Sequence, residues 1–299
     1  MAPGATPAPY APKRPSESRF LDIRGLRLHL RSWGPADAPV AVFLHGGLDA
    51  SATFQFVVDE LSRDRRILAP DWRGHGLSAW APGGYWFQDY LADLDAILDA
   101  LGLTDPVPLV GHSLGGNVAC TYAGARPERV ARLISLDGFG LPDRNPADAP
   151  AHLARWLDGL REGPRPPRPY TSLADMAERL RAANPRLSAD KALFMAEHLG
   201  RALPDGRYAW AHDPVHRLPF ATLHRKAEWA ASVSAIKAPT LWIGSGQPFP
   251  PGIANEPGGL EARVALIPGA RYARIEGTGH NLHHEEPAAV ARLIEDFLS

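Results

Sequence analysis

A serine, Ser113, stands at the centre of a G-x-S-x-G pattern that covers residues 111–115. The short apolar run 107–110 precedes this pattern and the small-residue stretch 116–125 follows it, which predicts a strand that turns sharply into a helix. Such a turn holds the serine hydroxyl in the open, because glycines let the backbone pass closely without Cβ clashes. The pattern therefore predicts Ser113 as a nucleophile.

A serine hydroxyl attacks well only when a base takes its proton, and a histidine titrating near neutrality suits that exchange. His280 is the predicted base, because it follows the strand-like segment 271–275 and a glycine near the end of the chain. His283 and His284 are the nearest competitors. These histidines and their neighbouring glutamates resemble a metal-binding cluster, but no cysteine or second spaced ligand set accompanies them, so we expect no metal site and no cofactor.

Two further motifs stand upstream of the serine in the chain. The sequence H-G-G-L, residues 45–48, follows the buried-strand pattern 40–44, and residues 71–78 read D-W-R-G-H-G-L-S. Together with the serine turn and the late G-H pair, these motifs resemble those of the α/β-hydrolase superfamily, over nearly everything from about Phe20 to Ser299. The resemblance implies an α/β fold with a mostly parallel sheet, helices on both faces and an inserted helical cap. It also implies a serine esterase-like activity.

Negative charge on a substrate carbonyl oxygen needs donors that are already in place, and backbone N–H groups supply them in this superfamily. The resemblance points to Leu114, directly after the nucleophile, and to Gly47 in the H-G-G loop. Leu48 is the alternative to Gly47. The amino-terminal end of the helix that begins near Leu114 adds partial positive charge at the same point.

The acid that orients the histidine departs from the common pattern of the superfamily. Relatives place an aspartate about three residues past the glycine that ends the strand 240–243, but Gln247 stands there. Some members carry the acid one strand earlier, where Asp137 ends the run 132–136, so Asp137 is the predicted acid. The order Ser113, Asp137, His280 then matches the order of nucleophile, acid and base in hydrolases of this kind. Two other candidates remain open, namely Glu256 and Asp213.

Composition narrows the class of protein. The chain has 299 residues, of which 45% are hydrophobic, so it can bury one large core and an insertion. A formal net charge of −1 provides no basic field for nucleic acid or an anionic membrane. The single cysteine, Cys120, cannot form an internal disulfide, which favours a cytoplasmic location.

Strand-length apolar runs alternate with helical patterns along most of the chain, which favours a parallel sheet covered on both faces. Residues 1–18 are rich in proline and alanine and are expected to form a disordered tail. No apolar run reaches the length of a membrane span. The interval 139–237 carries helical stripes and no convincing strand, and is expected to form the cap. The core is then formed by residues 19–138 and 238–299. The predicted strands are 26–31, 40–44, 66–69, 107–110, 132–136, 240–243 and 271–275.

These features predict a hydrolase that cleaves an ester or a related acyl bond through an acyl-enzyme on Ser113, without a cofactor. The expected partner is a small, partly apolar ester or acyl substrate, since the cap carries aromatic side chains that suit an apolar pocket. A carbon–carbon bond hydrolase or a lactonase would use the same motifs. A ligand-binding protein without activity is the alternative outside enzymes. The aromatic residues are Trp156, Trp210, Phe220 and Trp229.

Overall fold

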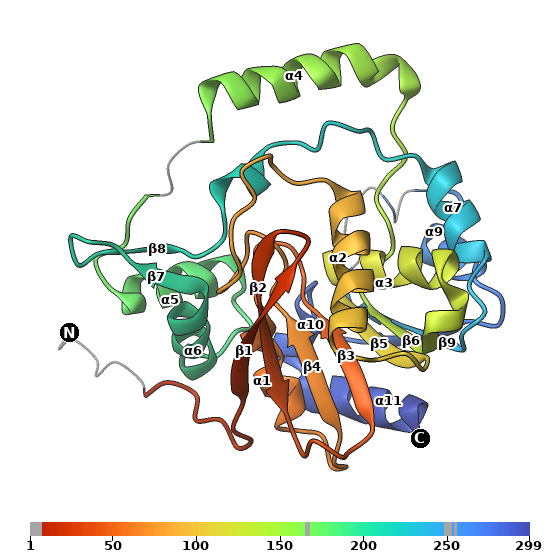
Figure 1. The fold of residues 1–299 in the computed structure, drawn as a ribbon, viewed down its shortest axis with the longest axis horizontal. Coiled ribbons are helices and arrows are strands. Elements are labelled where there is room, and N and C mark those ends of the chain that lie inside the picture. The colour runs from red at the N-terminus through yellow and green to blue at the C-terminus, as the bar shows by residue number, and fades with distance from the viewer. Residues whose placement is uncertain (1–7, 165–167, 248–252, 254–255) are drawn as a thin grey trace.

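All the predicted strands lie in one central sheet. The computed structural model describes residues 8–164, 168–247, 253 and 256–299, and its eight-stranded sheet has the order β1-β2-β4-β3-β5-β6-β9-β10 (Figure 1). Strand β2 runs in the opposite direction to the other seven strands of this sheet, and all the pairs that do not involve β2 are parallel. The predicted mostly parallel sheet is confirmed. The strands are β1 (Glu17–Ile23), β2 (Leu26–Trp33), β3 (Val40–Leu44), β4 (Arg66–Pro70), β5 (Val107–His112), β6 (Val130–Leu136), β9 (Thr240–Ser245) and β10 (Arg271–Ile275).

Successive residues of the strands feed two separate apolar layers, as the period of a strand requires. In β6, for example, Leu133 joins one buried cluster and Ile134 joins the other, and both side chains are fully buried. The first layer lies under α2, α3, α7 and α9, and the second under α1 and α11 (Figure 1). Those helices are α1 (Gln55–Val58), α2 (Phe87–Ala100), α3 (Leu114–Ala125), α7 (Lys226–Ser234), α9 (Gly259–Val264) and α11 (Pro287–Leu298).

The prediction of a disordered tail through Ser18 is wrong for residues 8–18. The carboxylate of Asp59 fixes this segment, because it accepts hydrogen bonds from the Tyr10 hydroxyl at 2.9 Å and from the Arg14 backbone N–H at 2.8 Å. Residues 1–7 lie outside the described residues. The edge strand β1, which begins within the expected tail, was not predicted because most of its side chains are exposed and only Ile23 is fully buried.

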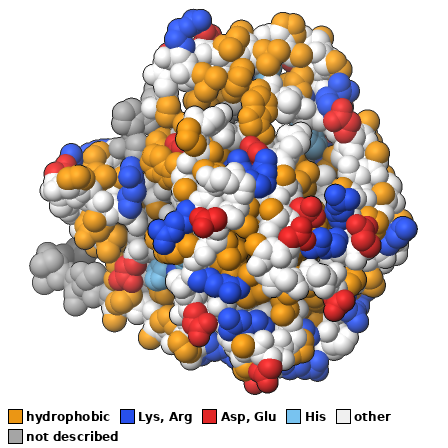
Figure 2. Space-filling view, viewed as in Figure 1, with side chains coloured by type: hydrophobic (Ala, Val, Ile, Leu, Met, Phe, Trp, Pro, Cys, Tyr) orange, Lys and Arg blue, Asp and Glu red, His pale blue; other side chains and the backbone are white. Residues whose placement is uncertain are grey.

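The segment predicted as the cap, called the cap below, lies between β6 and β9, and its described residues form three helices and a small hairpin. The first helix, α4, lies at the top of Figure 1, away from the sheet, and none of its residues is fully buried. Figure 2 shows hydrophobic side chains gathered over this part of the molecule. The hairpin was not predicted, since strands of three residues leave no readable alternation. The elements are α4 (Ala149–Glu162), α5 (Leu173–Ala183), α6 (Ala189–Leu199), β7 (Gly200–Ala202) and β8 (Tyr208–Trp210).

The predicted carboxyl-terminal boundary of the cap, residue 237, is too late. Trp229 and Val233 of α7 are buried in the same apolar layer as α3. The two helices pack so closely that a Cβ atom at Gly124 would lie 1.9 Å from the carbonyl oxygen of Ser232. Helix α7 is therefore part of the core, and its apolar residues were assigned to the cap because the sequence does not show which layer they join.

Short elements complete the description. No helix among the described residues is both long and apolar enough to cross a membrane. The short elements are the helix α10 (Leu282–Glu285) and the 3₁₀ turns η1 (Ser51–Phe54), η2 (Pro127–Arg129), η3 (Pro146–Asp148) and η4 (Pro214–Arg217).

Candidate active site

Ser113 lies at the turn between β5 and α3, in a backbone conformation that few non-glycine residues adopt. Its φ and ψ angles are 50° and −111°, and its backbone N–H donates to the carbonyl oxygen of Leu136 at 2.9 Å. The flanking glycines permit this turn: a Cβ atom at Gly111 would lie 2.3 Å from the oxygen of Gly115, and one at Gly115 would lie 2.1 Å from the oxygen of Leu44. The strain is held by close backbone packing that only glycine allows.

A continuous chain of hydrogen bonds joins the three residues predicted as nucleophile, base and acid. The His280 Nε2 atom lies 2.9 Å from the Ser113 Oγ atom, and the His280 Nδ1 atom lies 2.7 Å from the Asp137 Oδ2 atom. A carboxylate only accepts, so Nδ1 carries a proton and Nε2 of the neutral ring is left to accept the serine proton. Asp137 is 3% exposed, whereas the side chain of His280 is 21% exposed. The histidine therefore faces the solvent side and the acid lies behind it.

Asp137 is held by the end of the neighbouring strand β9. The Ser245 backbone N–H donates to Oδ1 of Asp137 at 3.0 Å. The Ser245 hydroxyl lies 3.2 Å from Oδ2 and 2.5 Å from the carbonyl oxygen of Gln247, so its one proton is shared between these two acceptors. The Asp137 N–H donates to the carbonyl oxygen of Ile243 at 2.9 Å, which continues the pairing of β6 with β9. Strand β9 thus holds the carboxylate of Asp137 in place, although Asp137 itself follows the neighbouring strand β6. Sequence reasoning missed Ser245, which has no motif of its own.

The two other candidate acids are engaged elsewhere. Glu256 accepts from Arg263 Nη2 at 2.6 Å and from Lys226 Nζ at 2.6 Å. Burial raises the pKa of this carboxyl, but the hydrogen bonds from Arg263 and Lys226 outweigh it and keep the pKa below its ordinary value. Asp213 accepts from the Tyr85 hydroxyl at 2.7 Å and caps the turn η4. The backbone N–H of Gln247 donates to the carbonyl oxygen of Thr278.

Contacts around His280 hold its loop against the nucleophile turn. The His112 Nε2–H group donates to the carbonyl oxygen of His280 at 2.9 Å. The Gly279 backbone N–H donates to Oε2 of Glu285 at 2.7 Å, and Asn184, at the end of α5 in the cap, donates to Oε1 of the same carboxylate at 3.0 Å. Glu285 therefore ties the base loop to the cap, a role that the sequence did not reveal.

The predicted oxyanion donors lie on the two segments that flank the serine. Leu114 is the first residue of α3, so its N–H precedes the hydrogen-bonded turns of the helix. On the other side, a Cβ atom at Gly46 would lie 3.3 Å from the Ser113 Cβ atom, which places the loop that contains Gly47 beside the nucleophile. The alternative donor, Leu48, has a φ of 60° and a side chain that is 41% exposed.

The D-x-R-G-x-G-x-S segment is structural. The buried carboxylate of Asp71 accepts from the backbone N–H groups of Ser51 at 2.7 Å and Leu77 at 2.9 Å, and lies 2.8 Å from Nδ1 of His29. Its partners keep the pKa of Asp71 well below its usual range despite the opposing effect of burial. A Cβ atom at Gly76 would lie 2.2 Å from this carboxylate, which explains the glycine.

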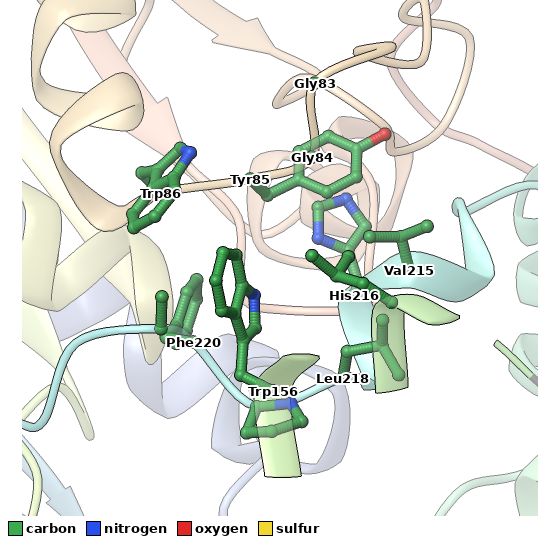
Figure 3. A pocket seen from close by; sticks show the side chains of 12 residues that line it. Gly83, Gly84, Tyr85, Trp86, Trp156, Val215, His216, Leu218 and Phe220 are labelled. Atoms are coloured by element: carbon green, nitrogen blue, oxygen red, sulfur yellow. The ribbon is translucent and has the colours of Figure 1, made fainter. Parts of the chain in front are cut away.

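A small pocket opens where the cap meets the loop before α2, as Figure 3 shows. Trp86 and Trp156 face one another across it, with ring centroids 5.8 Å apart, and Phe220 lies beside them. Of the four aromatic residues expected in the cap pocket, Trp156 and Phe220 line it. Trp229 lies in the core instead, and Trp210 packs against Tyr170, with ring centroids 5.5 Å apart.

Comparisons with known proteins agree with this fold. The chain is similar to a serine hydrolase-like protein of Danio rerio, with 29% identity over 89% of this chain and 83% of the relative. It is also similar to the sn-1-specific diacylglycerol lipase ABHD11 of Mus musculus, with 25% identity over 99% of this chain and 92% of the relative. Among solved structures, a thioesterase domain from the curacin biosynthetic pathway superposes with a TM-score of 0.83 at 28% identity, covering 94% of this chain and 99% of the domain.

The sequence profile of the alpha/beta hydrolase fold family matches residues 39–287, which is most of the chain. The match includes the serine turn, the late histidine loop and the cap between them. Family and relatives together support a hydrolytic enzyme. The chain belongs to the alpha/beta hydrolase fold family.

Proposed function

We propose that this chain is a serine hydrolase that cleaves an ester or a related acyl bond through an acyl-enzyme on Ser113. The observation that carries the proposal is the hydrogen-bonded series Ser113, His280, Asp137, with distances of 2.9 and 2.7 Å. Similarity to a diacylglycerol lipase and to a thioesterase domain supports acyl chemistry, while similarity to a 2-hydroxy-6-oxo-2,4-heptadienoate hydrolase supports the carbon–carbon bond alternative.

The first half of the proposed reaction forms the acyl-enzyme. Nε2 of His280 takes the proton of the Ser113 hydroxyl while Oγ attacks the carbonyl carbon. The oxyanion accepts hydrogen bonds from the backbone N–H groups of Gly47 and Leu114. Asp137 stabilises the imidazolium, which then protonates the leaving alcohol or thiol as its bond to the acyl carbon breaks.

The second half releases the acid. Water replaces the leaving group, and His280 takes its proton as the water oxygen attacks the acyl carbon. The second oxyanion uses the same two backbone donors. When it collapses, the bond to Ser113 Oγ breaks, and His280 returns its proton to the serine. No cofactor enters this cycle, because every proton is held by a side chain that the chain itself supplies.

The substrate we propose is a small molecule with an apolar acyl or alcohol group. Trp86, Trp156 and Phe220 supply an apolar surface at the junction of cap and core. The rings offer large contact area to an apolar chain. We further propose that the enzyme works in the cytoplasm, since its one cysteine, Cys120, is buried and forms no disulfide.

A serine-reactive fluorophosphonate tests the mechanism. Mass spectrometry of the labelled chain is expected to place the probe on Ser113, and Ser113→Ala is expected to abolish labelling. The matched control is Ser234→Ala, which changes an exposed serine of α7 and keeps the nucleophile. If the wild type is not labelled, the chain is a binding protein and not a serine hydrolase.

A substrate panel tests the bond that is cleaved. Short and long acyl esters, acyl thioesters, lactones and vinylogous diketones are assayed with the wild type and with Ser113→Ala. We expect turnover of esters or thioesters by the wild type and none by Ser113→Ala. Turnover of the diketone alone would assign carbon–carbon bond hydrolysis instead, and turnover of lactones alone would assign a lactonase.

A further inference from the structure

A second group of titratable side chains lies behind the proposed catalytic residues. Asp49 follows the H-G-G-L loop, whereas His283 and His284 lie on the short helix α10 near the other end of the chain. Oδ2 of Asp49 is 3.8 Å from Nε2 of His283 and 3.7 Å from Nε2 of His284. One ligand atom from each of the three residues lies within 4.8 Å of the other two. The fold thus brings together two imidazoles and one carboxylate from distant segments.

These side chains are buried, and several of their polar atoms lack a hydrogen-bond partner. His283 is 0% exposed and neither of its ring nitrogens has a partner among the described residues. The same holds for Nε2 of His284 and for Oδ1 of Asp49. Buried polar atoms are nearly always satisfied in folded proteins, so unpartnered nitrogens on two neighbouring histidines indicate a bound ion or water. One nitrogen of each ring is free to bind such a group.

The separations fit ligands of one ion better than hydrogen bonds. Distances of 3.7 and 3.8 Å are too long for a hydrogen bond. Two ligands that each lie about 2.1 Å from a tetrahedral ion are about 3.4 Å apart. The two separations from Asp49 exceed this value by a few tenths of an ångström, and all three atoms lie within 4.8 Å of one another, so the side chains would have to draw together around an ion. Oδ2 of Asp49 also accepts from the Thr53 hydroxyl at 3.0 Å, which orients the carboxylate.

The ionisation states also suit coordination. Both rings are buried, and burial favours the neutral form of an imidazole. Both rings are therefore neutral near pH 7, and neutral imidazole is the form that binds metal. Two imidazoles and a carboxylate are a ligand set that Zn²⁺ and related ions accept.

We propose that Asp49, His283 and His284 bind one divalent transition-metal ion of the Zn²⁺ class. The proposal differs from the expectation of no metal at these histidines, because it adds a carboxylate that comes from a distant part of the chain. Asp49 and His284 remain 8% and 3% exposed, so an ion can reach the site from their side. The ion would also stabilise the loop that carries His280. The ring of His283 packs against the ring of His112, with centroids 4.1 Å apart, and His112 donates a hydrogen bond to the carbonyl oxygen of His280.

Titration of the full-length, tag-free chain with Zn²⁺ and Co²⁺ tests the site. The chain is first stripped with a chelator, and binding is followed by calorimetry for Zn²⁺ and by visible absorption for Co²⁺. We expect one ion per chain, and a loss of affinity of about tenfold or more in Asp49→Asn and in His284→Gln. His198→Gln is the matched control. His198 is a half-buried histidine outside the group, and its Nδ1 atom is hydrogen-bonded to the carbonyl oxygen of Phe194 in the same helix. It is expected to bind as the wild type does.

Two results would overturn the proposal. One is a wild-type chain that takes up neither ion under a large molar excess, which would assign the unpartnered atoms to buried water. The other is equal affinity in Asp49→Asn, His284→Gln and the wild type, which would mean an adventitious surface site. Should a variant fail to fold, anomalous scattering from wild-type crystals at the zinc edge decides instead. A peak between Asp49 and His284 supports the site, and a peak only elsewhere refutes it.

Discussion

Two aspartate–histidine groups use the same stretch of chain in opposite ways. In the first, His280 lies 2.7 Å from Asp137, and the pair forms a hydrogen bond that leaves Nε2 directed at Ser113. In the second, His283 and His284 lie 3.7 to 3.8 Å from Asp49, and no hydrogen bond closes. Residue type alone therefore does not decide the role of a histidine. The role depends on the distance between the histidine nitrogen and the carboxylate oxygen, and on how many hydrogen bonds the carboxylate accepts.

The support of each carboxylate explains the difference. Asp137 continues the sheet at the end of β6, and its Oδ1 accepts from the Ser245 backbone N–H while its Oδ2 lies against His280 Nδ1. That arrangement fixes the carboxylate at hydrogen-bonding distance from His280. Asp49 accepts from Thr53 through one oxygen only, and its other oxygen has no partner among the residues that the structure describes. The first arrangement suits proton transfer, and the second suits an ion.

The strongest test of this contrast removes one histidine of each group. We expect His280→Gln to lower kcat about 10⁶-fold, because loss of the base alone removes nearly all of the acceleration that such a group provides. His284→Gln is expected to lose far less, since it removes no group that touches Ser113. Steady-state rates on the best ester of the panel measure both. Equal losses in the two variants would contradict the assignment of the base.

The acid gives the second test. Asp137→Asn is expected to lower kcat about 10⁴-fold, because the amide no longer stabilises the imidazolium or fixes its tautomer. Glu256→Gln is the matched control, as its carboxylate is engaged by Arg263 and Lys226, and its rate should stay within about threefold of the wild type. The reverse outcome would return Glu256 to the role of acid.

Metal binding provides the third test and concerns stability. Zn²⁺ at about 100 times its dissociation constant should raise the free energy of unfolding by about 2.7 kcal/mol, because the ion binds the folded state alone. Chelation should remove this gain in the wild type. Denaturant unfolding with and without Zn²⁺ measures it. In Asp49→Asn the two curves should coincide, and a gain of the same size there would place the ion elsewhere.

A third aspartate–histidine group extends the comparison to the cap. The carboxylate of Asp213 accepts hydrogen bonds from the Tyr85 hydroxyl and from the Val215 backbone N–H. The ring of His216 packs on the Tyr85 ring, with centroids 3.7 Å apart. Burial lowers the pKa of His216 to about 4, although the charge of Asp213 opposes the change. Here the neighbouring carboxylate does not keep the histidine protonated.

The lowered pKa of His216 makes one contribution to the loss of stability in acid. Below about pH 6.5 the unfolded chain protonates His216 and the folded chain does not, so stability falls as the pH drops toward 4. We expect His216→Gln to reduce that slope by up to about 1.4 kcal/mol per pH unit, measured by denaturant unfolding across this range. An unchanged slope would show that the ring is already protonated in the folded state.

The sequence predicted the parts that local pattern determines. The G-x-S-x-G turn and the apolar runs can be recognised from residues that are neighbours in the chain. The position of Ser113 and the strands of the central sheet other than β1 could therefore be predicted. Edge strand β1 and the cap hairpin could not, because their side chains are mostly exposed or their strands too short to show a period. Long-range contacts were also beyond reach, among them those of Ser245 with Asp137 and of Asp49 with His283.

The smallest expected effect distinguishes the residues that orient each carboxylate. Ser245→Ala removes the hydroxyl 3.2 Å from Oδ2 of Asp137 but keeps the backbone donor. We therefore expect kcat to fall by at most about fivefold, which corresponds to about 1 kcal/mol for one full hydrogen bond. Thr53→Ala removes the matching hydroxyl donor of Asp49, and should weaken Zn²⁺ binding by a similar factor while changing kcat less than Ser245→Ala does. We would measure kcat and the calorimetric affinity for Zn²⁺ in both variants. If each variant changes both quantities equally, the two carboxylates are coupled through the loop that contains His280 and do not act as separate sites.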